Sequence, residues 1–214
     1  MIRILLADDH ALYREGLRLL LERAGSFTIV GEAADGGEAV RLAFELLPDV
    51  ILLDISMPVY NGIEATARIR KAWPHAKIVL LSMHEDETTI LEALKAGVNG
   101  YVFKTQTERD LVHTIEVVAD GAFFLGPNIP HSVIDALTHN ASHVSDALTE
   151  REQQIVALIA DGKTSREIAE ILHLSPKTIE SHRARIMQKL KLQQTTQLVC
   201  YAVRAQMQRL APLR

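Results

Sequence analysis

Cysteine is almost absent from this sequence. The 214 residues include one, Cys200, so no internal disulfide can form, and a reducing compartment such as the cytoplasm is expected. Long apolar runs are also missing. The first run, residues 2–7, is too short for a signal-peptide core, and none reaches the roughly 18 residues needed to span a bilayer. Hydrophobic residues still make up 48% of the chain, which predicts a globular protein with no membrane partner.

Two nucleotide-binding motifs are missing as well. No G-x-G-x-x-G follows the first apolar run, and no G-x-x-x-x-G-K-[ST] occurs anywhere in the chain. These glycine-rich loops let backbone N–H groups approach phosphates closely. The sequence therefore indicates neither a dinucleotide site nor a P-loop.

Charge is unevenly distributed along the chain. Residues 1–147 carry 12 lysines and arginines against 21 aspartates and glutamates, whereas residues 148–214 carry 11 against 6. An acidic first part and a basic second part suggest two units with different partners, and nucleic acid is the obvious partner for the basic one.

The first 120 residues alternate between two patterns. Short aliphatic runs at 2–7, 27–31, 50–53, 77–81 and 101–103 are typical of buried strands. Segments with helical spacing of apolar residues lie between and after them. Five strands that alternate with helices predict an α/β doubly wound fold, with a five-stranded parallel sheet of the flavodoxin-like type.

After about residue 120 the alternation stops. Glycine and proline punctuate residues 120–145, which we interpret as a linker with one short helix at 132–137. Beyond it every segment is helical. Thr149 and Thr164, each followed three residues later by glutamate, predict capping boxes, and Ser175 with Pro176 predicts a third helix start. A further helix begins at Thr195 or just after it, which gives an all-α four-helix domain.

Polar side chains follow four of the expected strands. Asp8 and Asp9 follow the first, Asp54 the third, Ser82 the fourth and Lys104 the fifth. Ligands of open parallel sheets bind beyond the carboxyl ends of the strands, so we expect these groups to converge. Three neighbouring carboxylates need a cation, and an all-oxygen cluster suits Mg²⁺. Asp54 could then attack phosphorus as a nucleophile while Lys104 and Ser82 hold the phosphoryl oxygens.

The segments LLDISMPVYNG and YVFKT, with these acids and the lysine, resemble the receiver domain of two-component response regulators over residues 1–119. The resemblance implies that Asp54 accepts a phosphoryl group from a cognate histidine kinase. It also implies a Mg²⁺ site formed by Asp8, Asp9, Asp54 and the backbone carbonyl of Ser56. Ser82 and Tyr101 would form a switch pair, and Lys104 would bind the phosphoryl group.

The segment LTEREQQIVALIADGKTSREIAEILHLSPKTIESHRARIMQKL resembles the LuxR-type helix-turn-helix, over residues 146–210. Both resemblances together place the chain close to the NarL/FixJ family of response regulators. Ile179, Ile186 and Leu190 share one face of the third helix and should pack inward, which leaves the opposite face for the major groove of DNA.

Ten residues of this helix are candidate DNA contacts. Some suit phosphate oxygens, whereas Glu180 and Ser181 suit base edges. Arg183 falls near the packed face and reaches DNA only if its stem bends outward. The full set is Lys177, Thr178, Glu180, Ser181, His182, Arg183, Ala184, Arg185, Gln188 and Lys189.

Two other functions remain open from sequence. One is a DNA-binding regulator that ignores phosphate and uses the receiver only as a dimerisation platform. The other is an aspartyl-phosphate phosphohydrolase, but dehalogenase-type phosphatases carry an acid two residues after the nucleophile, where this chain has Ser56. We expect a non-enzymatic regulator that forms a homodimer when active, and we hypothesise that Ser56 and His84 tune the lifetime of the phosphate.

Overall fold

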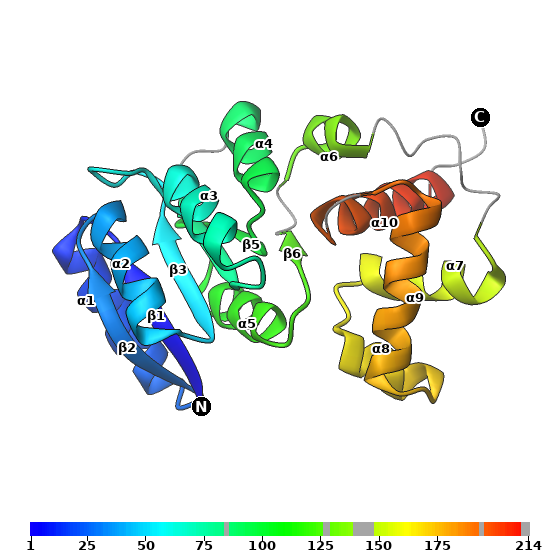
Figure 1. Ribbon diagram of the computed structural model, residues 1–214, viewed down its shortest axis with the longest axis horizontal. Helices are drawn as coiled ribbons and strands as arrows, with labels where there is room; N and C mark the ends of the chain where they lie inside the picture. The colour runs from blue at the N-terminus through cyan, green and yellow to red at the C-terminus, as the bar shows by residue number, and fades with distance from the viewer. Residues whose placement is uncertain (84–85, 126–128, 139–147, 193–194, 211–214) are drawn as a thin grey trace. The chain divides into compact units, whose positions relative to one another are not determined.

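The computed structural model describes residues 1–83, 86–125, 129–138, 148–192 and 195–210 (Figure 1). It divides into two compact units. The first comprises Met1–Ala119 and Phe124–Pro127, and the second comprises Asp120–Phe123 and Asn128–Arg214. None of the described helices is long and apolar enough to cross a membrane.

A parallel sheet forms the centre of the first unit. Its strands are β1 (Ile2–Ala7), β2 (Phe27–Ala33), β3 (Val50–Asp54), β4 (Ile78–Ser82), β5 (Gly100–Phe103) and β6 (Phe124–Leu125). Their order across the sheet is β2-β1-β3-β4-β5-β6, and every neighbouring pair is parallel. All five residues of β3 and of β4 are buried, which explains why these central strands are continuous aliphatic runs rather than alternating ones.

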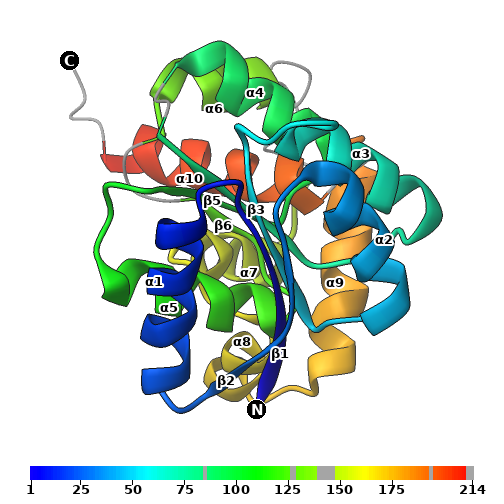
Figure 2. The same ribbon diagram turned by 90° about the vertical axis from the view of Figure 1, so that its left-hand side faces the viewer.

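Helices cover both faces of the sheet, as the doubly wound prediction required. They are α1 (Ala11–Arg23), α2 (Gly36–Leu46), α3 (Gly62–Ala72), α4 (Glu87–Ala96) and α5 (Glu108–Ala119). Figure 2 shows α1 and α5 on one side of the strands and α2 and α3 on the other. Beneath α1 and α5, inward residues such as Leu21, Leu52 and Ile115 are fully buried in one apolar cluster.

The strand count corrects the sequence prediction of five. The sixth strand, β6, lies inside residues 120–145, which we expected to be linker, and pairs with Gly100 and Tyr101 of β5. A strand of two residues has no detectable alternation, so sequence periodicity could not reveal it.

The second unit is helical. Its helices are α6 (His131–Thr138), α7 (Glu150–Ala160), α8 (Ser165–Leu172), α9 (Pro176–Lys189) and α10 (Thr195–Leu210). The expected short helix at 132–137 therefore exists, as α6, but it is more than a connector: it contacts α10 and buries Val133 and Ile134. Cys200 on α10 is fully buried, in keeping with a packing role.

The three predicted helix starts of this unit are confirmed. The side chains of Thr149 and Thr164 accept from the N–H groups of Glu152 and Glu167, and both glutamates complete the capping box. Ser175 accepts from the Thr178 N–H, and Pro176 occupies the first turn. Since these caps satisfy backbone donors that would otherwise lack partners, they fix where α7, α8 and α9 begin.

Candidate functional sites

The polar residues that follow the strands lie at one edge of the sheet. Asp8 comes after β1, Asp54 ends β3, Ser82 ends β4 and Lys104 comes after β5. Asp8 and Ser82 are fully buried, and Asp54 is 2% exposed. The parallel topology accounts for this, because it carries the carboxyl ends of all these strands to the same edge.

Lys104 links two of the carboxylates. Its Nζ lies 2.7 Å from Oδ2 of Asp8 and 2.9 Å from Oδ1 of Asp54, and its side chain is only 6% exposed. Burial lowers the pKa of Lys104, but the hydrogen bonds to Asp8 and Asp54 outweigh it, so the pKa lies above its usual value. The lysine is therefore charged, and it balances one of two buried negative charges.

Asp54 keeps one oxygen free. Its Oδ2 is buried and has no hydrogen-bond partner among the described residues. Burial raises the pKa of Asp54 above its usual value, although Lys104 acts in the opposite direction. A buried carboxylate oxygen without a partner is costly, so this atom is the natural point of attachment for a cation or an electrophile.

The donor set fits a divalent cation. Asp8, Asp9, His10 and Asp54 each offer a ligand atom, and all four atoms lie within 4.8 Å of one another. Asp9 and His10 are exposed, so an ion could enter from solvent. Sequence reasoning overlooked His10; the signal was its place directly after the acidic pair. Ser56 is exposed in the loop after β3, and ligation by its carbonyl stays a prediction.

Ser82 and Tyr101 lie on the neighbouring strands β4 and β5, in a register that pairs Tyr101 with Leu80 and Ser82 with Phe103. Tyr101 is fully buried, and its ring meets that of Phe103 edge-on. Burial raises the pKa of Tyr101, and a hydrogen bond with the Ser82 side chain opposes the shift. The two residues of the expected switch pair are therefore in contact, with the tyrosine turned inward.

The loop between β3 and α3 is tightly fitted around Asp54. A Cβ on Gly62 would lie 2.3 Å from the Asp54 backbone oxygen, and one on Gly36 would lie 1.9 Å from the Tyr60 carbonyl oxygen. Only glycine allows such close backbone approach. Val59, by contrast, adopts φ +69°, an unfavourable value for a β-branched residue.

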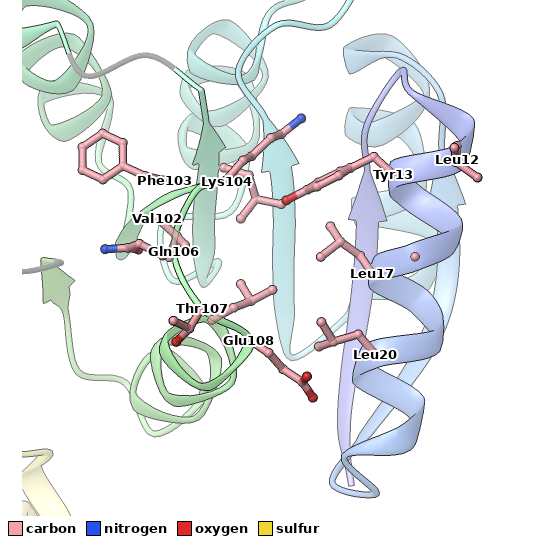
Figure 3. A pocket seen from close by; sticks show the side chains of 13 residues that line it. Leu12, Tyr13, Leu17, Leu20, Val102, Phe103, Lys104, Gln106, Thr107 and Glu108 are labelled. Carbon is pink, nitrogen blue, oxygen red and sulfur yellow. The ribbon is translucent and has the colours of Figure 1, made fainter.

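An apolar groove runs beside the carboxylate site, between α1 and the start of α5, with a volume of about 550 Å³ (Figure 3). Leu17, Leu20 and Leu111 line it. At its rim Tyr13 points toward Lys104, whose Nζ lies 4.4 Å from the centre of the tyrosine ring. The side chain of Lys104 is thus held by the aromatic ring as well as by the two carboxylates.

The predicted packing of α9 is confirmed. Ile179 and Ile186 are fully buried and Leu190 is 1% exposed, which turns the opposite face of the helix outward. Exposed residues of that face include most of the candidate DNA contacts: Lys177, Glu180, Ser181, Ala184, Arg185, Gln188 and Lys189, with Thr178 and His182 half-buried beside them. A hollow of about 320 Å³ lies over its first turns, lined by Ser175, Lys177, Thr178, Ser181, His182 and Arg185.

Three of the candidate contacts bind side chains of the neighbouring helices α7 and α8. Arg183 is 5% exposed and donates to Oγ of Ser165 at 2.9 Å, so its stem does not bend outward as a DNA contact would require. Glu180 accepts a hydrogen bond from the same Ser165 hydroxyl. Lys189 pairs with the buried Glu152 at 2.6 Å. These bonds tie α9 to α8 and α7.

Fold and site together define a receiver unit joined to a helix-turn-helix unit, and comparison with known proteins agrees. Residues 4–116 match the response regulator receiver domain, and residues 146–202 match the luxR family of bacterial regulatory proteins. The chain belongs to the NarL/FixJ family of two-component response regulators.

Relatives extend over nearly the whole chain. The transcriptional regulatory protein LiaR of Bacillus subtilis (strain 168) is 38% identical, over 95% of this chain and 98% of its own length. The oxygen regulatory protein NreC of Staphylococcus carnosus (strain TM300) is 35% identical, over 95% and 97%. Among solved structures, a two-component response regulator RcsB–DNA complex is 26% identical, with a TM-score of 0.57 over 94% of this chain and 96% of that one.

Proposed function

We propose that Asp54 is the phosphoacceptor and that its phosphorylation controls sequence-specific DNA binding by α9. The observation that carries the first half is the state of the Asp54 carboxylate: Lys104 holds one oxygen, and the other is buried without a partner among the described residues. The free oxygen would attack the phosphorus of a phosphohistidine on a histidine kinase, and the imidazole would leave with the electron pair.

Each neighbouring residue has a part in this step. Asp8 and Asp9, with Asp54 and the Ser56 carbonyl, would hold Mg²⁺, which lowers the negative charge met by the incoming phosphate. Lys104 would bind a phosphoryl oxygen once the reaction adds negative charge at Asp54. The Ser82 hydroxyl would bind a second oxygen, which would draw it from its hydrogen bond with Tyr101 and begin the conformational response.

The second half of the proposal, DNA binding, concerns α9. The exposed Lys177 and Arg185, with Thr178, would contact phosphates, and Glu180 and Ser181 would read base edges. Arg183, Glu180 and Lys189 also join α9 to its neighbours, so we give Arg183 a positioning role rather than a DNA contact. The similarity to RcsB, whose structure was solved as a complex with DNA, supports double-stranded DNA as the partner. We further propose that the active form is a homodimer on paired half-sites, and that it acts in the cytoplasm, where its DNA lies.

The two alternative functions, a phosphohydrolase and a regulator that does not respond to phosphorylation, gain less support. A phosphohydrolase acting on outside substrates would need a general acid two residues after Asp54, and Ser56 cannot serve. A regulator that ignores phosphate would not need the buried lysine and the free carboxylate oxygen, which cost stability when nothing binds them.

Two measurements test the proposal. Acetyl phosphate with Mg²⁺ should add the mass of one phosphoryl group to the wild type and none to Asp54→Asn; equal labelling of both would place the phosphoacceptor elsewhere. For DNA, binding to a duplex selected from a random pool should weaken as salt rises, and Lys177→Ala should weaken it and reduce the salt slope by about one. A salt-independent affinity would contradict the assignment of α9.

A further inference from the structure

His10 occupies a position that normally favours another residue type. It is the residue that caps the N-terminus of α1, where serine, threonine, aspartate and asparagine are preferred because their side chains accept from the backbone. The His10 side chain makes no such bond. Its imidazole turns toward the acids of the carboxylate site, although its side chain is 67% exposed and could point into solvent.

The distances suit metal ligation. Nδ1 of His10 lies 2.8 Å from Oδ1 of Asp9 and 3.3 Å from Oδ1 of Asp8. Two ligands on adjacent corners of an octahedron, each about 2.1 Å from the ion, are about 3.0 Å apart. The imidazole nitrogen therefore already stands at the spacing expected between neighbouring ligands of one cation.

A second observation shows that the cluster is open to a ligand. Oδ2 of Asp54 is buried, has no partner among the described residues, and belongs to a side chain that is 3% exposed. A ligand atom of this carboxylate lies within 4.8 Å of those of Asp8, Asp9 and His10. The cluster therefore combines closely spaced ligand atoms with a buried carboxylate oxygen that has no partner among the described residues.

We infer that His10 is a nitrogen ligand at this site and that it raises the affinity for borderline transition ions such as Co²⁺ and Zn²⁺ relative to Mg²⁺. Imidazole suits such ions, whereas Mg²⁺ prefers oxygen throughout. The inference rests on the proposed metal-dependent site and names one more ligand in it. The chemistry is a mixed set of one nitrogen and three carboxylates, open to solvent on the side of Asp9 and His10.

The competing explanation is a plain ion pair between a protonated His10 and the two acids. Exposed ion pairs contribute little to stability and have no preference among metal ions. The two explanations differ in one measurable quantity, the contribution of His10 to the ratio of Co²⁺ to Mg²⁺ affinity, because a nitrogen ligand adds a preference for the transition ion that an ion pair does not.

The test uses the full chain and compares Co²⁺ and Mg²⁺ binding, by visible absorption and by calorimetry, in the wild type and in His10→Gln. The ratio of Co²⁺ to Mg²⁺ affinity should fall about tenfold or more in the variant. It should stay unchanged in His75→Gln, which replaces an exposed histidine after α3. Asp54→Asn should also weaken Co²⁺ binding, since it removes a ligand from the same ion. An unchanged ratio in His10→Gln overturns the inference.

A second readout needs no variant. In the Co²⁺-loaded wild type, proton NMR should show strongly shifted, non-exchangeable ring protons from one ligating histidine, and their absence overturns the inference even if His10→Gln does not fold. Failure of the underlying proposal looks different: the wild type would then bind neither cation and would take no phosphoryl group from acetyl phosphate with Mg²⁺. Normal labelling by acetyl phosphate, together with an unchanged ratio of Co²⁺ to Mg²⁺ affinity in His10→Gln, would contradict only the assignment of His10 as a ligand.

Discussion

Lys104 and Asp54 form a half-satisfied pair: the lysine Nζ lies 2.9 Å from one carboxylate oxygen, and the second oxygen is buried without a partner among the described residues. Because Lys104 also binds Asp8 at 2.7 Å, one positive charge serves two buried negative ones. The site therefore holds an excess of negative charge that a cation would relieve.

Replacing Lys104 should leave the negative charges of Asp8 and Asp54 unbalanced. Lys104→Met leaves Asp8 and Asp54 buried without a counter-charge, and we expect the free energy of unfolding of the receiver unit to fall by about 3 kcal/mol. Mg²⁺ should restore part of the loss, since it would take over the charge balance. Trp73, the one tryptophan, lies at the end of α3 and reports on this unit in urea titrations. Lys95→Met, at an exposed site on α4, is the control, and equal effects of both variants would refute the account.

Gly62 should tolerate no side chain. In Gly62→Ala the new Cβ meets the Asp54 backbone oxygen at 2.3 Å and a Leu80 methyl at 2.9 Å, so the end of β3 must shift. We expect a loss of about 2–3 kcal/mol and slower labelling by acetyl phosphate. Gly16→Ala offers a matched control, since a Cβ there meets nothing within 4 Å on helix α1 and should add about 0.5–1 kcal/mol. A neutral Gly62→Ala would show that the loop is looser than described.

Val59 stores backbone strain beside the site. Its φ of +69° is costly for valine, and its side chain is 71% exposed, so little packing opposes replacement. Val59→Asn should raise the free energy of unfolding by about 1 kcal/mol, because asparagine tolerates this conformation. Urea titration followed by Trp73 fluorescence measures it. Leu47→Gly at the end of α2, where φ is +46°, should also raise the free energy of unfolding. Destabilisation in both variants would contradict the strain argument.

The Glu152–Lys189 pair makes the second unit sensitive to acid. Burial raises the pKa of Glu152, but hydrogen bonds from Lys189 and Thr149 outweigh it and hold the pKa below its usual value. A carboxylate with a lowered pKa stabilises the fold above its unfolded pKa, and this contribution disappears as pH falls through the folded value. Glu152→Gln should therefore reduce stability by about 1–2 kcal/mol at pH 7 and by less below about pH 4.

Hydrogen exchange of the α7 and α9 amides in the full chain, corrected for intrinsic rates, measures this difference. Glu170→Gln, at an exposed position on α8, should change protection little at either pH. If Glu152→Gln reduced stability as much at about pH 3 as at about pH 7, the charge of the glutamate could not be the cause. The ion pair with Lys189 would then not explain the loss of stability.

Much of the molecule follows from local sequence rules. The strand ends at Asp54 and Ser82 and the caps at Thr149, Thr164 and Ser175 were predictable, because strand runs and capping boxes are short-range patterns. The buried face of α9 was predictable, because the spacing of its isoleucines places them on one side of the helix.

Other features depend on contacts between distant segments. The strand β6 carries no periodic signal and exists through its pairing with β5. Arg183 is buried because Ser165, 18 residues earlier, accepts its hydrogen bond, and α6 is part of the second unit because it contacts α10. The orientation of His10 toward Asp9 depends on how α1 begins. His84, expected to tune the phosphate's lifetime with Ser56, lies outside the described residues, so that hypothesis stays a prediction.

The coupling between Asp54 and DNA is the central claim, and one titration tests it most directly. Affinity for the selected duplex is measured by fluorescence anisotropy, with and without acetyl phosphate and Mg²⁺, for the wild type and Asp54→Asn. Phosphorylation should tighten binding by the wild type about fivefold or more and leave Asp54→Asn unchanged. Equal responses of the two proteins, or no response in a wild type whose mass shows one added phosphoryl group, would contradict the account.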